Sequence, residues 1–303
     1  MTRLYKYLII ILLGALAWNA GAQPVNPDYQ AGVTNYHNSD WDGTISNFTK
    51  TIEANYDLYD SYSYRAYCLA KKGDSNGAVA DCKQLVALAP KWAGSYYWCS
   101  RVALASTNYE GALRTFETGL RMDPATRPDD LRERLMNHYM DLYFEAAQAS
   151  KLDVALSEID KVIDIDPTNS PSHFTRAWLR IMQGRFDVAI LDADFAIQYN
   201  PKSPNAYGAL AWARCGRGDA SGAAEACQKE IDAWEEFFAK RPQAREHAAD
   251  EVLIPQGLLC YVKNDFSGAV DNWEKYMKKH GNEMPQLWQT FFQSWIDKAK
   301  AKK

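Results

Sequence analysis

The 303-residue sequence lacks the short motifs that most often mark a catalytic or nucleotide-binding site. It has no GxxxxGK(S/T) or GxGxxG glycine loop, no GxSxG nucleophile turn, no HExxH metal motif and no CxxC pair. Phosphate-binding loops, the serine-hydrolase turn, the zincin helix and the zinc knuckle therefore have no support. Five scattered histidines and a formal net charge of −4 give no reason to expect a metal or a nucleic acid. We expect no enzyme activity and no cofactor.

Long hydrophobic runs are also absent, except at the N-terminus. Residues 8–18 form an apolar stretch that follows Arg3 and Lys6 and precedes a small-x-small cleavage pattern ending at Ala22. The stretch is shorter than the ~20 residues that span a bilayer. It predicts a secretory signal peptide over residues 1–22, cleaved after Ala22, and hence a periplasmic or secreted protein. The alternative is an uncleaved helix that anchors the chain in a membrane.

The sequence does contain an internal repeat. Alanine recurs at positions 78, 112, 155, 189, 223 and 269, with Thr44 in the equivalent place, at steps of 34, 34, 43, 34, 34 and 46 residues. Proline at positions 90, 124, 167 and 201 would end a helix in each of four repeats, because it lacks an amide donor. Gly73-Asp74 and Gly218-Asp219 provide turns that end one helix and cap the next. The pattern predicts a stack of antiparallel helix pairs.

This 34-residue period, with Ala at position 20 and Pro at position 32, resembles the tetratricopeptide repeat (TPR). The resemblance covers roughly residues 25–283. It implies an all-α fold, a right-handed α-solenoid of about seven TPR-like helix pairs. The repeats would start near residues 25, 59, 93, 136, 170, 204 and 250, so that residues 23–283 form the solenoid. The two longer steps predict a lengthened first helix near residues 127–134 and a lengthened second helix near residues 234–240.

Residues 284–303 follow the last repeat. Their apolar side chains have i, i+4 and i+7 spacing, which predicts an amphipathic helix. We expect a C-terminal capping helix, and a helix bound to a membrane surface is the alternative.

Two Arg–Asp pairs recur in register with the repeat. Arg65 and Asp81 occupy the same repeat positions as Arg176 and Asp192. Their recurrence favours structural ion pairs, each within one repeat, over a catalytic arrangement. We expect the other carboxylates to face solvent or to cap helices.

The six cysteines acquire positions from the TPR resemblance. In that architecture a second helix packs against the next first helix, which implies the possible disulfides Cys82–Cys99 and Cys227–Cys260. An oxidising compartment would favour such bonds. The alternative is that the cysteines are small buried thiols.

The resemblance also implies a binding groove, because first helices line the concave face of TPR arrays. The matching positions here are largely aromatic or apolar. The predicted peptide-binding residues are Tyr29, Tyr36, Tyr67, Lys71, Tyr97, Arg101, Phe144, Phe174, Trp178, Trp212, Leu258 and Tyr261. Tyr29 and Val33 stand where chaperone-tail binders of the family carry Lys and Asn, so repeat 1 does not support a carboxylate clamp. The alternative is that tight winding of the array, or the protein's own termini, covers this face.

These features predict a non-enzymatic, exported scaffold that binds a peptide or helix segment of another protein. Large rings suit such a role, since they provide contact area at low entropic cost. Two alternatives stay open. One is a membrane-anchored envelope assembly factor held by the uncleaved N-terminal helix. The other is a carbohydrate-binding module or enzyme that uses the same aromatic groove.

Overall fold

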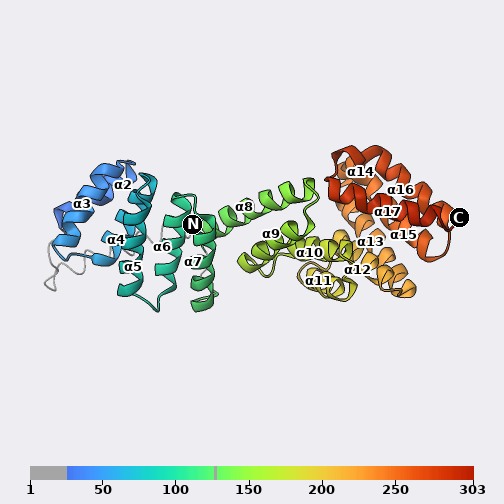
Figure 1. The fold of residues 1–303 in the computed structure, drawn as a ribbon, viewed down its shortest axis with the longest axis horizontal. Helices are drawn as coiled ribbons and strands as arrows, with labels where there is room; N and C mark the ends of the chain where they lie inside the picture. The colour runs from blue at the N-terminus through green and yellow to red at the C-terminus, as the bar shows by residue number, and fades with distance from the viewer. Residues whose placement is uncertain (1–25, 126–127) are drawn as a thin grey trace. The chain divides into compact units, whose positions relative to one another are not determined.

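The computed structural model describes residues 26–125 and 128–303, and the regular elements in these ranges are all helices (Figure 1). The predicted signal peptide lies outside the described residues. Among the residues described, no helix is both long and apolar enough to span a membrane. The chain divides into two compact units, Met1–Arg127 and Pro128–Lys303, here called unit 1 and unit 2.

Unit 1 contains three pairs of helices within its described residues. They are α2 (Pro27–His37) with α3 (Trp41–Glu53), α4 (Leu58–Lys71) with α5 (Ser75–Leu88), and α6 (Ala93–Ala105) with α7 (Tyr109–Met122). Each first helix also contacts the first helix of the next pair, α2 with α4 and α4 with α6.

Unit 2 contains four further pairs and a last helix. The pairs are α8 (Asp129–Gln148) with α9 (Leu152–Ile165), α10 (Ser170–Met182) with α11 (Phe186–Tyr199), α12 (Pro204–Gly216) with α13 (Ala220–Lys240), and α15 (Leu253–Val262) with α16 (Phe266–His280). The short elements α14 (Pro242–Ala248) and η2 (Ala249–Val252) precede α15, and η3 (Gly281–Glu283) precedes α17 (Gln286–Lys300). The predicted all-α fold of seven helix pairs with a C-terminal helix is confirmed.

Five of the seven second helices begin with the same kind of cap. An Asp or Asn side chain accepts a hydrogen bond from the backbone N–H of the glycine three residues later, at 2.9–3.0 Å, in Asp40, Asp74, Asn108, Asp219 and Asp265. Such a cap satisfies one unpaired N–H of the first turn and contributes about 1 kcal/mol. Before two of these caps the chain turns through Gly73 and Gly218, at φ of 87° and 90°, where any other L-residue would be strained.

The recurring alanines lie inside the helix pairs. Ala112, Ala155, Ala189, Ala223 and Ala269 are 0% exposed, and Ala78 is 1% exposed. A larger side chain at these positions would push the two helices apart, which explains why a small residue returns once in every repeat. The two longer steps correspond to long helices: α8 has 20 residues and α13 has 21.

The last helix, α17, folds back onto the first helices of unit 2. Its buried face contains Phe291, Phe292, Trp295, Ile296 and Ala299. It contacts α16 and α8, and its rings also reach side chains of α10, α12 and α15. The helix is therefore more than an end cap, because it covers the first-helix side of unit 2.

Candidate functional site

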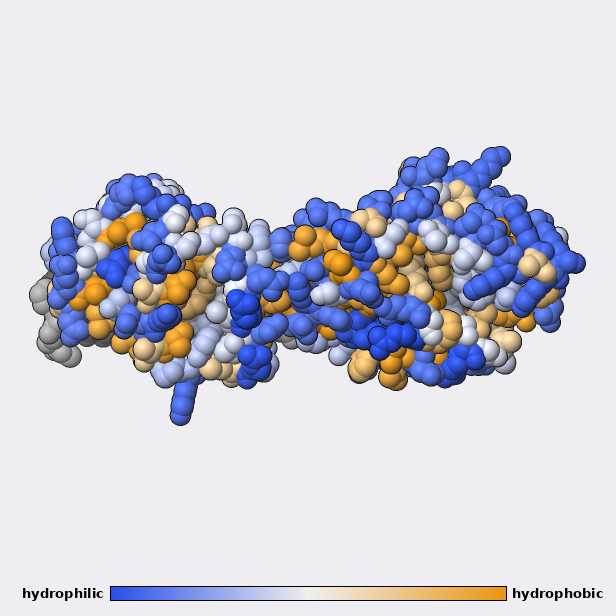
Figure 2. Space-filling view, viewed as in Figure 1, coloured by the Kyte–Doolittle hydropathy of each residue, from blue (hydrophilic) through white to orange (hydrophobic). Residues whose placement is uncertain are grey.

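Five half-buried rings of unit 1 form a continuous set, here called the aromatic face. Tyr36, Tyr64, Tyr67 and Trp98 lie on the first helices, and Trp41 lies at the start of the second helix α3. Ring centroids lie 4.8 Å apart for Tyr36–Tyr64, 5.7 Å for Tyr36–Tyr67 and 5.8 Å for Tyr64–Trp98, all edge to face. Apolar patches interrupt the hydrophilic surface of this unit (Figure 2). Within residues 26–125, no helix lies across the aromatic face.

Two cations lie over the aromatic face. The Lys71 Nζ is 5.6 Å from the Tyr67 ring centroid, and the Arg101 guanidinium carbon is 5.6 Å from that of Trp98. Burial and the neighbouring Tyr67 raise the pKa of Tyr36 to about 12, while Arg101 opposes this shift. The Tyr36 hydroxyl is therefore a neutral donor at physiological pH. The face combines aromatic contact area with positive charge.

Two predicted groove residues of unit 1 have structural roles. The Tyr29 hydroxyl donates a 2.8 Å hydrogen bond to Asp60, which joins α2 to α4. Tyr97 is only 3% exposed; its hydroxyl donates to the Asp123 carbonyl at 3.3 Å, and its ring packs on Gly119 of α7. The ring that faces outward is the neighbouring Trp98. Its position was visible in the sequence, because Trp98 lies 34 residues after Tyr64.

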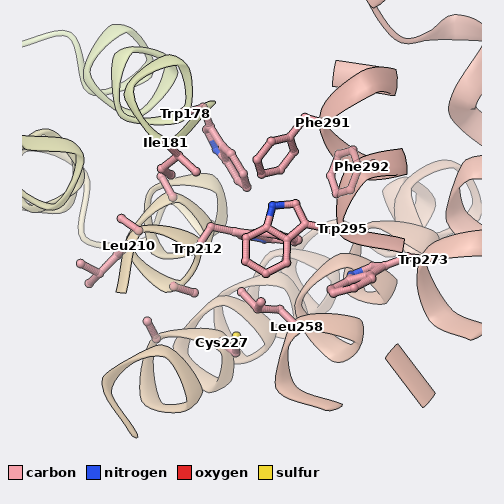
Figure 3. Close-up of a cluster of buried hydrophobic side chains, with 14 of the residues drawn as sticks. Trp178, Ile181, Leu210, Trp212, Cys227, Leu258, Trp273, Phe291, Phe292 and Trp295 are labelled. Atoms are coloured by element: carbon pink, nitrogen blue, oxygen red, sulfur yellow. The ribbon is translucent and has the colours of Figure 1, made fainter. Parts of the chain in front are cut away.

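The predicted groove of unit 2 is occupied by α17. Trp212 and Leu258 are 0% exposed, and Trp178 is 8% exposed. The ring centroid of Trp178 lies 5.1 Å from Trp288, and those of Trp212 and Tyr261 lie 5.0 Å and 5.3 Å from Trp295. Figure 3 shows Trp178, Trp212, Phe291 and Trp295 gathered around one centre. The four predicted residues Trp178, Trp212, Leu258 and Tyr261 are therefore not an open binding surface, because the chain's own C-terminal helix fills the place.

The remaining two predicted groove residues of unit 2 differ in exposure. Phe144 on α8 is 51% exposed. Phe174 on α10 is partly buried and lines a cavity beside α17.

Both Arg–Asp pairs are buried ion pairs within one repeat. Arg65 Nε and Nη2 donate to the two carboxylate oxygens of Asp81 at 2.8 and 2.7 Å. Arg176 binds Asp192 in the same way, at 3.0 and 2.7 Å. Each Arg also bonds the second helix of the preceding repeat, Arg65 to Thr49 at 3.1 Å and Arg176 to Asp160 at 2.8 Å. The pairs therefore join neighbouring repeats as well as the two helices of one repeat.

The predicted disulfides are not formed, because all six cysteines are free thiols. Cys82 and Cys99 are neighbours: the Cys99 Sγ lies 3.7 Å from the Cys82 carbonyl oxygen, and both line an apolar cleft of about 460 Å³. Hydrogen bonding with the Cys99 thiol, together with burial, raises the pKa of Cys82.

The second predicted disulfide fails for a different reason. Cys260 points toward the α15–α16 turn, where a Cβ on Gly268 would lie 3.1 Å from its sulfur. Burial raises the pKa of Cys227, and the nearby Glu230 and Cys215 raise it further. The rule that a second helix packs on the next first helix identifies the helices in contact but not the direction of each side chain.

Glu230 on α13 is a further residue that the sequence pattern did not lead us to select. We expected carboxylates to face solvent, yet Glu230 is 5% exposed and its Oε2 has no hydrogen-bond partner. Burial raises its pKa well above the usual value, and Glu251 adds to the rise. The signal was present, because Glu230 follows Ala223 by seven residues and Cys227 by three, on the buried face of the helix. In the described part of the chain, no group of three or more His, Cys, Asp or Glu is suited to a metal ion.

One stretch of the chain matches a protein-family model. Residues 174–236 match the family model described as tetratricopeptide repeat. No curated protein sequence matches the chain significantly. The C-terminal part of a TPR repeat-containing protein from Cytophaga hutchinsonii is 13% identical, with 82% of this chain and 94% of that chain covered and a TM-score of 0.42.

Two smaller TPR structures show similar coverage. YrrB, a TPR protein with an unusual peptide-binding site, is 20% identical, with 64% of this chain and 97% of its own covered and a TM-score of 0.31. A thermophilic TPR protein of Thermus thermophilus is 19% identical, with 71% of this chain and 94% of its own covered and a TM-score of 0.27. Residues 174–236 are thus the part of the chain that matches the tetratricopeptide-repeat model directly.

Proposed function

We propose that the chain is a non-enzymatic scaffold and that unit 1 binds a segment of another protein on its aromatic face. The observation that carries this proposal is the combination of Tyr36, Tyr67 and Trp98 with Lys71 and Arg101 on first helices that no described helix of unit 1 covers. Tyr, Trp and Arg are the residues most enriched at the centres of protein interfaces.

The charge on this face indicates the kind of segment. The two cations favour a partner segment with acidic side chains, and the rings favour one with aliphatic or aromatic anchors. Unit 2 is the less suitable surface, because α17 already covers its first helices.

Selection of short random peptides displayed on phage, with the full chain as bait, tests this assignment. The selected peptides should combine Asp or Glu with large apolar residues. Changing both Lys71 and Arg101 to Glu should weaken the best peptide at least tenfold, about 1.4 kcal/mol. Lys83→Glu, a charge reversal at an exposed site on α5, is the matched control and should change little. Equal binding by the double variant and the control would overturn the proposal.

We further propose that the scaffold works outside the cytoplasm. The basic start, the short apolar stretch and the small residues before Gln23 support export and cleavage. N-terminal sequencing of the protein recovered from its native cells should give a chain that begins at Gln23. A chain that retains residues 1–22 would instead favour the membrane-anchored alternative.

A further inference from the structure

A cavity of about 300 Å³ lies in unit 2 where α10, α12, α13, η2, α15 and α16 meet α17 and the residues that lead into it. Five of its lining side chains are rings: Phe174, Trp178, Tyr276, Trp288 and Phe292. Two others are the carboxylates Glu230 and Glu251, and none of its lining residues is Lys or Arg. The cavity therefore combines aromatic rings with two carboxyl groups and has no basic side chain in its lining.

Glu230 is the least satisfied group in this cavity. The residue is only 5% exposed, and Oε2 accepts no hydrogen bond within the protein. The opposing helix α12 leaves room for it at Gly208, where a Cβ would lie 2.8 Å from Glu230 Oε1. A buried carboxyl without a partner is costly, and such groups normally bond to the protein, a water or a ligand. Its position therefore indicates a missing hydrogen-bond donor.

Glu251 adds negative potential beside Glu230. The Tyr276 hydroxyl donates to its two oxygens at 3.3 and 3.4 Å, and His280 and Asp250 lie nearby. Burial raises the pKa of Glu251 as well. Two carboxyls that repel each other's charge in one cavity would both be stabilised by a cation placed between them.

We propose that this cavity binds an alkylammonium group, with Glu230 Oε2 accepting a hydrogen bond from its N–H and the surrounding rings holding its positive charge. Ring faces attract cations, and the attraction is strongest when the site is desolvated. The unpartnered oxygen favours an ammonium with N–H donors over a quaternary ammonium, which has none. A free amine and a lysine side chain of a peptide share this chemistry. The site lies in unit 2 and does not depend on the aromatic face of unit 1.

Calorimetric titration of the full chain tests the proposal with two probes: n-butylammonium chloride for a free amine and N-acetyl-lysine methylamide for a peptide lysine. At least one should bind saturably, and the tighter probe identifies the source. Glu230→Gln should weaken that probe at least tenfold. Glu236→Gln, on the same helix but exposed, is the matched control and should bind as the unchanged chain does.

Two further measurements keep the outcome decisive. Because Gln is close to Glu in size and buries no charge, Glu230→Gln should melt no lower than the unchanged chain. If it fails to fold, Phe174→Leu replaces it and should weaken binding about threefold or more. The neutral isostere n-butanol should bind at least tenfold more weakly than n-butylammonium. Absence of saturable binding by both amines, equal binding by n-butanol, or unchanged affinity in folded Glu230→Gln would each overturn the proposal.

Discussion

Replacement of Arg65 by alanine is expected to lower the free energy of unfolding of unit 1 by about 3–5 kcal/mol, the loss typical when one partner of a buried ion pair is removed. The Asp81 side chain is 5% exposed and both of its oxygens are bonded to Arg65. Without Arg65 its charge would be buried and uncompensated. Hydrogen exchange followed by mass spectrometry on peptides of α4 and α5 measures the effect.

The equivalent change in unit 2 should cost less. Asp192 is bonded to Arg176 but also to Arg180, whose Nη1 lies 2.6 Å from Asp192 Oδ2. Arg176→Ala should therefore cost about 1–3 kcal/mol, and the Arg176→Ala, Arg180→Ala double variant should approach the Arg65→Ala loss. Lys50→Ala removes an exposed pair with Asp28 and is the control, at less than about 1 kcal/mol. Equal losses for the two single Arg variants would contradict this account.

Trp212→Ala is expected to destabilise unit 2 by about 3–5 kcal/mol and to release α17. Trp212 is 0% exposed, and its ring centroid lies 5.2 Å from Phe291 and 5.0 Å from Trp295 on that helix, and 5.5 Å from Trp273. Truncation would leave a cavity under α17. Thermal melting measures the stability, and limited proteolysis near residues 281–285 measures release of the helix.

Two variants calibrate this prediction. Trp212→Phe keeps a ring and removes an indole N–H that has no hydrogen-bond partner, so it should cost less than half as much. Trp92→Ala, at a ring that is 55% exposed in unit 1, should leave proteolysis of α17 unchanged. Intact α17 in the Trp212→Ala variant would show that its contacts with α8, α10, α15 and α16 hold the helix without Trp212.

The periodic features of the sequence predicted the fold because each depends only on neighbours in the chain. Alanine at a fixed step, Asp or Asn before the second helix and proline after it all act within one repeat. The pairing of Arg65 with Asp81 followed in the same way, since the spacing recurs at Arg176 and Asp192. In this chain, the packing of a helix pair, the capping of its second helix and its charge pair can each be predicted from the residues of one repeat.

The candidate sites were harder to predict because they depend on direction and on distant contacts. The apolar stripe of residues 284–303 shows that the helix buries one face, but not which surface receives it. Tyr97 and Trp98 are adjacent rings, and a rotation of about 100° along the helix separates a packed residue from an outward one. Glu230 lies against Gly208 of its own partner helix α12, and Glu251 of η2 lies near it. The repeat pattern does not place η2, because η2 belongs to the extra residues of the 46-residue step.

Because α17 folds back onto the first helices of unit 2, the two units should unfold in different ways. A repeat array is held by nearest-neighbour contacts, so its end repeats can open one at a time. In unit 2, contacts such as Trp178 with Trp288 and Trp212 with Trp295 join α10 and α12 directly to the end of the chain. Opening of any one of these helices then disturbs the same ring cluster. Unit 2 should open as a single cooperative block, whereas unit 1, whose described contacts run only between neighbouring helices, can fray from its ends.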